Sequence, residues 1–149
     1  MYAYLLTDLT EILSMTRYVA LIDGKPGAFG VVIPDCRGAC GMGRTIEDAL
    51  DNASEGLRAW TEAVEAQGGA APVPRSMEAV RAEVEADPDT SEVLYATVPL
   101  IRDLGRPVKA NLSLDSGVLA AIDATARRLG VTRSAMVELL AKRGLPAFG

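Results

Sequence analysis

The chain has 149 residues, a formal net charge of −5 and a hydrophobic content of 49%, which is the composition of a soluble globular protein. This length fits one ordinary domain or two small modules. No apolar run approaches the length of a membrane-spanning helix, and the N-terminus lacks the basic region and cleavage site of a signal peptide, so we expect a cytoplasmic protein.

The first part of the chain predicts an extension followed by a small sheet. Residues 1–16 are the expected extension, which is either a short amphipathic helix or read-through from a start ahead of Met15. Two runs rich in Val, Ile and aromatic residues, 18–22 and 29–33, predict strands, and the turn-forming residues between them predict a β-hairpin. A third short strand is expected near 39–43.

A long helix is predicted to begin after Thr45, because a threonine side chain can accept a hydrogen bond from a free amide of the first turn. Its apolar residues recur in steps of four and three and predict one buried stripe: Ile46, Leu50, Ala53, Leu57, Trp60 and Val64. Gly68 and Gly69 end it. A proline-containing extended segment, one or two helical turns at 77–85 and a strand at 92–100 complete this part, which we take as a domain over 17–100.

After a linker at 101–106, the segment 107–149 begins with a period of two, which predicts a strand with one apolar and one polar face. The apolar face carries Val108, Ala110, Leu112 and Leu114, and the polar face carries Lys109, Asn111 and Ser113. The period then becomes helical over 118–129. Gly130 supplies a residue that can turn left-handed, and Thr132 can cap a second helix that ends near Gly144 and Pro146.

This strand, helix, glycine-containing turn and capped second helix resemble, in that order, the ribbon-helix-helix family of DNA-binding proteins. A lone strand leaves its hydrogen-bonding edges bare, so one copy cannot bury a core. The resemblance implies a homodimer whose two strands pair into an antiparallel ribbon above four helices, with higher assembly left open. The residues expected at this dimer interface are Ala110, Leu112, Leu114, Val137 and Leu140.

The resemblance also implies how operator DNA is bound. A two-stranded ribbon fits the major groove, where Asn111 can pair with adenine, Lys109 can donate to guanine and Ser113 can contact either kind of group. The second helix would direct its N-terminal amides at a phosphate, helped by Thr132, Arg133 and Ser134. The alternative is a polar strand face that is only solvated.

The two parts of the chain differ in charge. Up to Leu100 there are seven Lys or Arg against sixteen Asp or Glu, a net −9, and from Ile101 onward eight against four, a net +4. A basic module joined to an acidic one predicts an anionic partner for the basic part.

The N-terminal part combines several short motifs in a characteristic order: Tyr18-Val19-Ala20, Pro34-Asp35 with Gly38, residues 43–53, Trp60, and Pro72, Pro74 and Ser76. In this combination it is similar to the HicB family of antitoxins. The likeness spans about 18–100, and one branch of the family adds a ribbon-helix-helix tail. Cys36 departs from the pattern, because the family more often has a large apolar residue there.

The family resemblance implies an α+β fold with a partial RNase H-like N-terminal domain. It also implies binding to a HicA-type toxin, a small basic RNA-cleaving protein, and repression of the antitoxin's own promoter. The residues that we expect to contact the toxin are Asp23, Phe29, Asp35 and Arg37. Two alternatives stay open. One is a stand-alone repressor whose N-terminal domain senses a small ligand, and the other is a nucleic-acid-processing enzyme, which would require metal-dependent cleavage that is lost on changing Asp23 or Asp35.

Catalysis and metal binding are not expected. RNase H chemistry needs carboxylates that hold metal ions, but Asp23, Asp35, Asp48 and Asp51 all fall outside the first strand run. The chain has no His for general base work. Its two cysteines are too few for a structural zinc site, and a disulfide is not expected in a reducing compartment. We therefore predict no catalytic residues, no metal and no cofactor.

Overall fold

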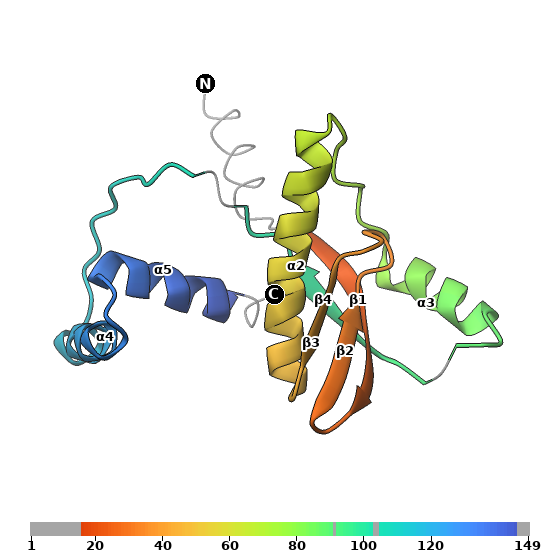
Figure 1. The fold of residues 1–149 in the computed structure, drawn as a ribbon, viewed down its shortest axis with the longest axis horizontal. Helices are drawn as coiled ribbons and strands as arrows, with labels where there is room; N and C mark the ends of the chain where they lie inside the picture. Colours follow the sequence, from red (N-terminus) through yellow and green to blue (C-terminus); the bar gives the residue numbers. More distant parts are fainter. Residues whose placement is uncertain (1–15, 91, 103–104, 146–149) are drawn as a thin grey trace. The chain divides into compact units, whose positions relative to one another are not determined.

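The computed structural model describes residues 16–90, 92–102 and 105–145 (Figure 1). All of the predicted extension except Thr16 lies outside the described residues, and so does Pro146, which was expected to follow the last helix. The chain divides into two compact units between residues 102 and 103. This break falls within 101–106, the segment expected as a linker.

The N-terminal unit is built on a four-stranded antiparallel sheet with the strand order β3-β2-β1-β4. Its strands are β1 (Arg17–Lys25), β2 (Ala28–Val32), β3 (Cys40–Gly43) and β4 (Leu94–Pro99). The predicted hairpin, the short third strand and the late strand are all present. Together with the helices they confirm the predicted α+β class with a small antiparallel sheet.

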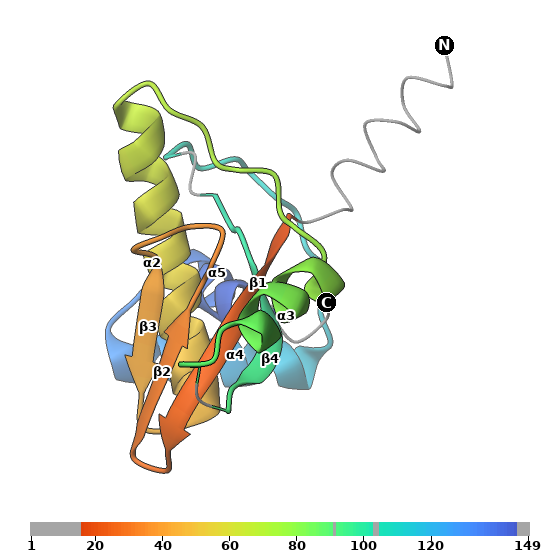
Figure 2. The same ribbon diagram turned by 90° about the vertical axis from the view of Figure 1, so that its right-hand side faces the viewer.

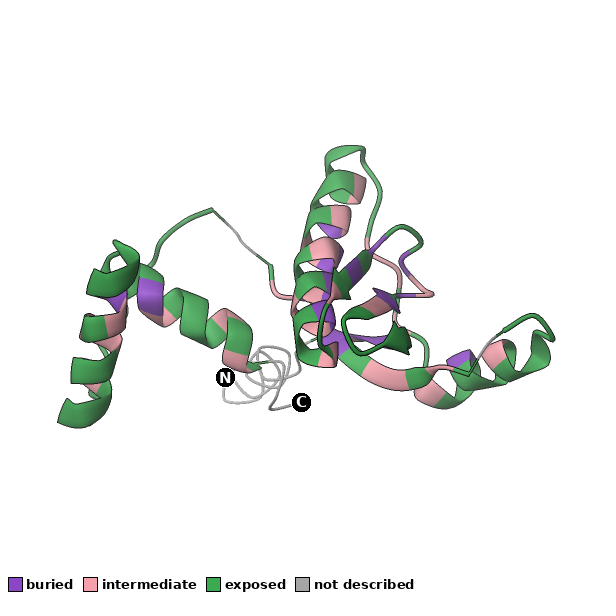
Figure 3. Cartoon of the chain, turned by 60° about the horizontal axis from the view of Figure 1, so that its bottom comes forward, coloured by how far each residue is buried: buried purple, intermediate pink, exposed green. Residues whose placement is uncertain are grey.

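Two helices cover opposite faces of this sheet. The long helix α2 (Ile46–Ala66) lies on one face, and α3 (Met77–Ala86) lies on the other, beside β1 and β4 (Figures 1 and 2). Most buried residues of the unit form one cluster between α2 and the sheet (Figure 3). They are Tyr18, Ala20, Ile22, Val31, Ile33, Cys36, Ala39, Ala49, Ala53, Leu57, Val98 and Leu100.

The buried stripe of α2 differs from the predicted one. Its fully buried residues are Ala49, Ala53, Leu57 and Thr61, whereas Leu50 and Trp60 are only partly buried beside the core. The helix lies so close to the sheet that small side chains occupy the centre of the contact and larger ones flank it. The predicted cap at Thr45 is confirmed, because its hydroxyl accepts a hydrogen bond from the amide of Asp48 at 3.1 Å.

Two glycines make this close approach possible. A Cβ on Gly41 of β3 would overlap the backbone nitrogen of Ala53, and a Cβ on Gly56 of α2 would overlap the carbonyl oxygen of Cys40. The side chain of Asn52 also donates to the carbonyl of Met42 at 2.7 Å. The helix therefore covers the outer edge of β3 as well as its face.

The third helix is longer than the one or two turns expected, and its Val80 is buried. The guanidinium of Arg81 lies 5.4 Å from the centre of the Tyr95 ring, a cation–π contact between α3 and β4. The proline-containing segment before α3 is tied to the sheet, because the Tyr18 hydroxyl donates to the carbonyl of Pro72 at 2.6 Å.

The C-terminal unit contains two helices, α4 (Ser116–Leu129) and α5 (Arg133–Gly144). Gly130 adopts the predicted left-handed conformation at the end of α4, with φ of 68°. Thr132 caps α5, because its hydroxyl accepts from the amide of Ala135 at 3.1 Å. Both helices begin and end close to the predicted positions.

The strand predicted over 108–114 is not formed in the single chain, where these residues are extended and unpaired. A strand is defined by backbone hydrogen bonds to a neighbour, and one copy of this unit offers none. Its apolar residues are exposed accordingly, including Val108, Leu112 and Leu114. Among the described residues of the unit, only Ala126 and Met136 are buried.

Cys36 is completely buried in the core of the N-terminal unit, so a small residue fills the site at which the sequence departs from the family pattern. Burial, with a smaller effect of the neighbouring Asp35, raises the pKa of the Cys36 thiol to about 11 from an ordinary value of 9.0. The folded state therefore favours the protonated thiol of Cys36 over its thiolate. Cys40 is exposed.

This burial predicts a loss of stability at alkaline pH. The unfolded chain ionises Cys36 above pH 9 and the folded chain only near pH 11, so stability present below pH 9 is lost as the pH rises toward 11. The free energy of unfolding of the wild type relative to Cys36→Ala should fall by about 2–3 kcal/mol over this range. Urea titrations at several pH values would measure it. Cys40→Ala is the matched control, and an equal pH dependence for the two variants would contradict the assignment.

Candidate protein- and DNA-binding surfaces

Asp35, an expected toxin contact, is turned toward its own chain. Its carboxylate accepts hydrogen bonds from the Arg75 backbone amide at 2.8 Å and from Arg75 Nε at 2.5 Å, and its side chain is only 5% exposed. The Arg75 guanidinium also pairs with Glu83 of α3. In this structure Asp35 fastens the segment before α3 to the loop after β2.

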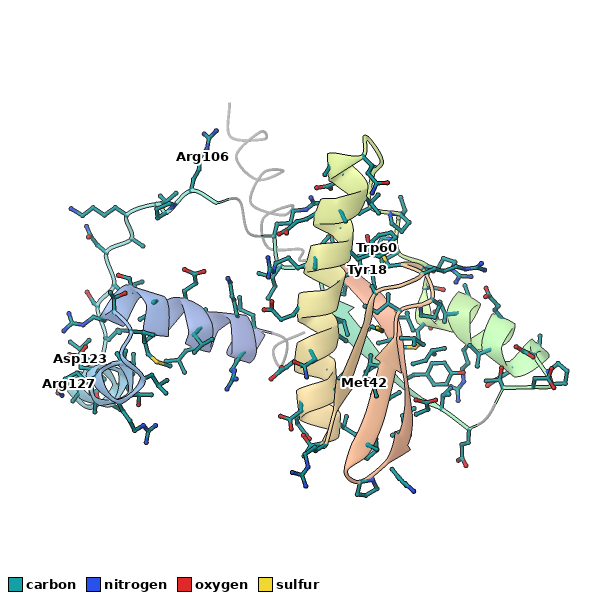
Figure 4. All side chains as sticks on the ribbon, viewed as in Figure 1. Tyr18, Met42, Trp60, Arg106, Asp123 and Arg127 are labelled. Atoms are coloured by element: carbon teal, nitrogen blue, oxygen red, sulfur yellow. The ribbon has the colours of Figure 1, made fainter. Side chains whose placement is uncertain are left out.

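Arg37, in the same loop, has an exposed side chain, and its carbonyl accepts from the indole nitrogen of Trp60 at 2.9 Å. The loop is therefore held from two sides, by Arg75 at Asp35 and by the partly buried Trp60 of α2 at Arg37. Figure 4 labels Trp60 near the end of the sheet where this loop lies.

The other two expected toxin contacts, Asp23 and Phe29, lie at the hairpin end of the sheet. Phe29 packs against the core on the α2 side. Asp23 is exposed on the opposite face, where its carboxylate lies beside Gly30. The four residues therefore occupy two ends and two faces of the sheet, and the structure does not bring them together.

The sheet face opposite α2 carries an exposed apolar patch that sequence reasoning did not single out. Val32 of β2 and Met42 of β3 are 52% and 74% exposed, on the half of the face that α3 does not cover (Figures 2 and 4). We call Val32, Cys40 and Met42 the open-face patch. Asp23 borders it, since Asp23, Gly30 and Met42 form one row across three strands. The sequence does carry a signal for these residues. Side chains alternate between the two faces along β2 and β3, so every second residue must face away from α2.

The residues expected to contact bases are exposed in the extended segment before α4. Lys109, Asn111 and Ser113 alternate with apolar residues that are also exposed. Of the residues expected at a dimer interface, Ala110, Leu112, Leu114 and Leu140 are exposed in the single chain, and Val137 is half-buried. The segment thus offers one polar and one apolar set of side chains for further contacts.

At the start of α5, the expected phosphate-binding residues have different surroundings. Thr132 and Ser134 are exposed, with the Thr132 hydroxyl capping the helix. Arg133 instead forms a bidentate ion pair with Asp123 of α4, with both nitrogen–oxygen distances at 2.7 Å. The hydrogen bond from Arg133 lowers the pKa of the Asp123 carboxyl below its usual value, and Arg127 on α4 adds a smaller effect. Figure 4 labels Asp123 and Arg127 on this helix.

Two features of other protein classes are absent from the described residues. None of their His, Cys, Asp and Glu side chains gather in threes where a metal ion could be held. None of the helices in this part of the chain has the length and apolar character needed to cross a membrane.

A family model for the HicB-like antitoxins of bacterial toxin–antitoxin systems matches residues 18–141. The chain belongs to this family. The match covers the sheet, α2 and α3 of the N-terminal unit and continues through α4 into α5. A comparison with curated proteins gave no match.

Several solved structures are similar to this HicB-like antitoxin. The HicB antitoxin of Burkholderia pseudomallei is 27% identical, with 86% of this chain and 97% of that chain covered and a TM-score of 0.48. A HicA3 and HicB3 toxin–antitoxin complex gives 23% identity, coverage of 58% and 98%, and a TM-score of 0.43. A toxin–antitoxin complex from Streptococcus pneumoniae gives 20%, 87% and 99%, and 0.42.

Proposed function

We propose that this antitoxin neutralises a small, basic, RNA-cleaving toxin of the HicA type and represses its own operon by binding operator DNA as a homodimer. Membership of the HicB-like family carries the first half of the proposal. The proposed action is binding rather than catalysis, and it places the protein in the cytoplasm, where its toxin and operator would be found.

The N-terminal unit is the proposed toxin-binding part. The chain up to Leu100 has a net charge of −9, which favours association with a basic protein that binds RNA. The open-face patch supplies exposed apolar side chains, with Asp23 beside it as an acidic neighbour. Partly buried apolar anchors ringed by polar groups are typical of protein interfaces.

A pull-down tests the proposed toxin binding. The tagged chain, isolated from its native cells, should retain a small basic protein in stoichiometric amount. After separation in denaturant and refolding, that protein should cleave RNA, and added antitoxin should stop the cleavage. Recovery of DNA without such a protein would instead favour a stand-alone repressor that senses a ligand.

Met42→Asp should weaken toxin capture at least tenfold, about 1.4 kcal/mol, because it places a charge in the centre of the open-face patch. The affinity of the purified pair, measured by calorimetry, is the readout. Val73→Asp is the matched control, because Val73 is also highly exposed but lies outside the patch. Equal affinity of the two variants would show that the toxin binds elsewhere.

The C-terminal unit is the proposed dimerisation and DNA-binding part. Its apolar residues, of which Leu112 is 61% exposed, leave apolar surface in contact with water in a single chain, which is unfavourable. Pairing the extended segments of two copies would satisfy their backbone groups and cover this apolar set. The polar set of Lys109, Asn111 and Ser113 would then lie on the outer face of a ribbon, and the +4 charge beyond Leu100 suits a nucleic acid.

Leu112→Asp should convert the dimer into monomers, because a carboxylate would replace an apolar side chain at the centre of the ribbon interface. Sedimentation velocity measures the change. Ser113→Asp is the control on the other face of the same segment: it should keep the dimer and weaken DNA binding. An intact Leu112→Asp dimer would contradict the pairing.

Asn111→Ala should cost about 1–3 kcal/mol in binding to the operator, because one bidentate contact to a base is lost. Binding to unrelated DNA should change little, since phosphate contacts carry no sequence information. Titrations of both DNAs at one fixed salt concentration would separate these effects. Equal operator affinity of the wild type and the variant would rule out base recognition by Asn111.

A further inference from the structure

One acidic side chain lies among the basic groups at the corner between α4 and α5. Asp123 of α4 accepts from Arg133 of α5 through both of its carboxylate oxygens, with nitrogen–oxygen distances of 2.7 Å. The hydrogen bond from Arg133 lowers the pKa of this carboxyl, and the charge of Arg127, one turn further along α4, adds a smaller effect. Asp123 is therefore ionised at neutral pH, although it belongs to the part of the chain proposed to bind an anion.

The geometry of this ion pair leaves part of the guanidinium available. A guanidinium carries five N–H donors, and the contact with Asp123 uses those of Nε and one of Nη2. Nη1 and the second hydrogen of Nη2 have no partner among the described residues. The Arg133 side chain is 59% exposed and that of Asp123 is 29% exposed. Arg133 is thus the outer member of the pair, and its remaining donors are accessible.

The first turn of α5 adds two further donors beside Arg133. The amide of Ala135 donates to the Thr132 hydroxyl at 3.1 Å, and the amide of Met136 donates to the Thr132 carbonyl at 2.9 Å. The amides of Arg133 and Ser134 have no partner among the described residues. These amides and the positive end of the helix dipole favour a phosphate oxygen, which is the contact expected of α5 in the proposed DNA binding.

The two helices are joined without the help of the ion pair. The amide of Val131 donates to the carbonyl of Ala126 at 3.0 Å across the left-handed Gly130, and Ala126 and Met136 are buried. Exposed ion pairs contribute little to stability. The contact with Asp123 instead restricts the Arg133 side chain, so that less rotational freedom is lost when the guanidinium meets a phosphate.

We propose that Asp123 is a positioning residue for DNA binding, which holds the Arg133 guanidinium ready for a DNA phosphate. The inference rests on the proposed DNA binding by the C-terminal unit. Asp123 would keep accepting from Nε and Nη2 while phosphate oxygens accept from Nη1 and the second Nη2 hydrogen. Because the donors of a planar guanidinium point to different sides, one cation can hold both anions at once.

The proposal predicts an effect opposite in sign to that of net charge alone. Removal of a negative charge from a DNA-binding unit strengthens binding when only charge matters. Asp123→Ala should instead weaken DNA binding by about threefold or more, because Arg133 loses its orientation. Glu138→Gln is the matched control, since Glu138 also pairs with a cation, Lys142, at 2.8 Å and its loss changes the net charge equally. This variant should bind DNA at least as tightly as the wild type.

Titrations of the full chain with two DNA duplexes at one fixed salt concentration measure the effect. One duplex carries the sequence upstream of the chain's own gene, and the other is an unrelated sequence of the same length. Phosphate contacts carry no sequence information, so Asp123→Ala should weaken binding to both by a similar factor, unlike Asn111→Ala. Sedimentation and thermal unfolding would establish whether each variant keeps the fold and the oligomeric state of the wild type.

A double-mutant cycle tests whether Asp123 acts through Arg133. In an Arg133→Ala background, Asp123→Ala should cause no further weakening. Arg133→Lys is a second route that leaves Asp123 in place: it keeps the charge, but a lysine lacks the planar group that could hold a carboxylate and a phosphate together. It should weaken binding to both duplexes by about threefold or more. A role confined to stability would lower the unfolding temperature and leave the affinities of the folded variants unchanged.

The outcomes separate this proposal from the proposed DNA binding. If Asp123→Ala strengthens binding as much as Glu138→Gln does, Asp123 only competes for Arg133, and the positioning role is overturned while DNA binding stands. Equal weakening by Asp123→Ala with and without Arg133 also overturns it. If Asp123→Ala unfolds the chain, Arg133→Lys decides, and an unchanged affinity of that variant overturns the proposal. If the wild type binds neither duplex, the proposed DNA binding itself fails and the positioning role fails with it.

Discussion

The packing of α2 directly on β3 is the contact on which the N-terminal unit depends. Gly41 and Gly56 remove the side chains that would separate the two backbones, and Ala49 and Ala53 keep the helix surface flat. This contact buries one face of the sheet and closes one edge in a single step. It leaves the far half of the opposite face and the edge of β4 as the surfaces from which binding can be built.

The sequence predicted the elements of this unit because their signals are local. Turn residues between two β-rich runs, a threonine cap and a change of period mark elements without reference to the rest of the chain. The exact buried face of α2 was not predicted, because it depends on how closely the helix approaches the sheet. At a close helix–sheet contact Ala49 and Thr61 become central and Leu50 and Trp60 peripheral, and apolarity alone ranks these residues in the opposite order.

Functional residues were harder to predict, because their roles depend on tertiary partners. Asp35 has the chemistry of a contact residue, but Arg75, forty positions away, turns it inward. Arg133 suits a phosphate, but Asp123 already holds it. Val32 and Met42 were overlooked because their exposure depends on α3 covering only the β1 and β4 half of that face. In each case the residue type suggested a role, but neighbouring residues in the fold determined whether the side chain is exposed.

The two units leave different kinds of groups exposed among their described residues. The C-terminal unit buries only Ala126 and Met136 among its described residues, so most of its apolar surface awaits a partner. The N-terminal unit has a buried core, and its described residues leave exposed the small open-face patch and backbone groups along β4. Apolar area drives association, whereas a few hydrogen bonds exchanged with water contribute little net free energy. The proposed pairing of two C-terminal units would therefore draw its free energy mainly from the burial of apolar surface.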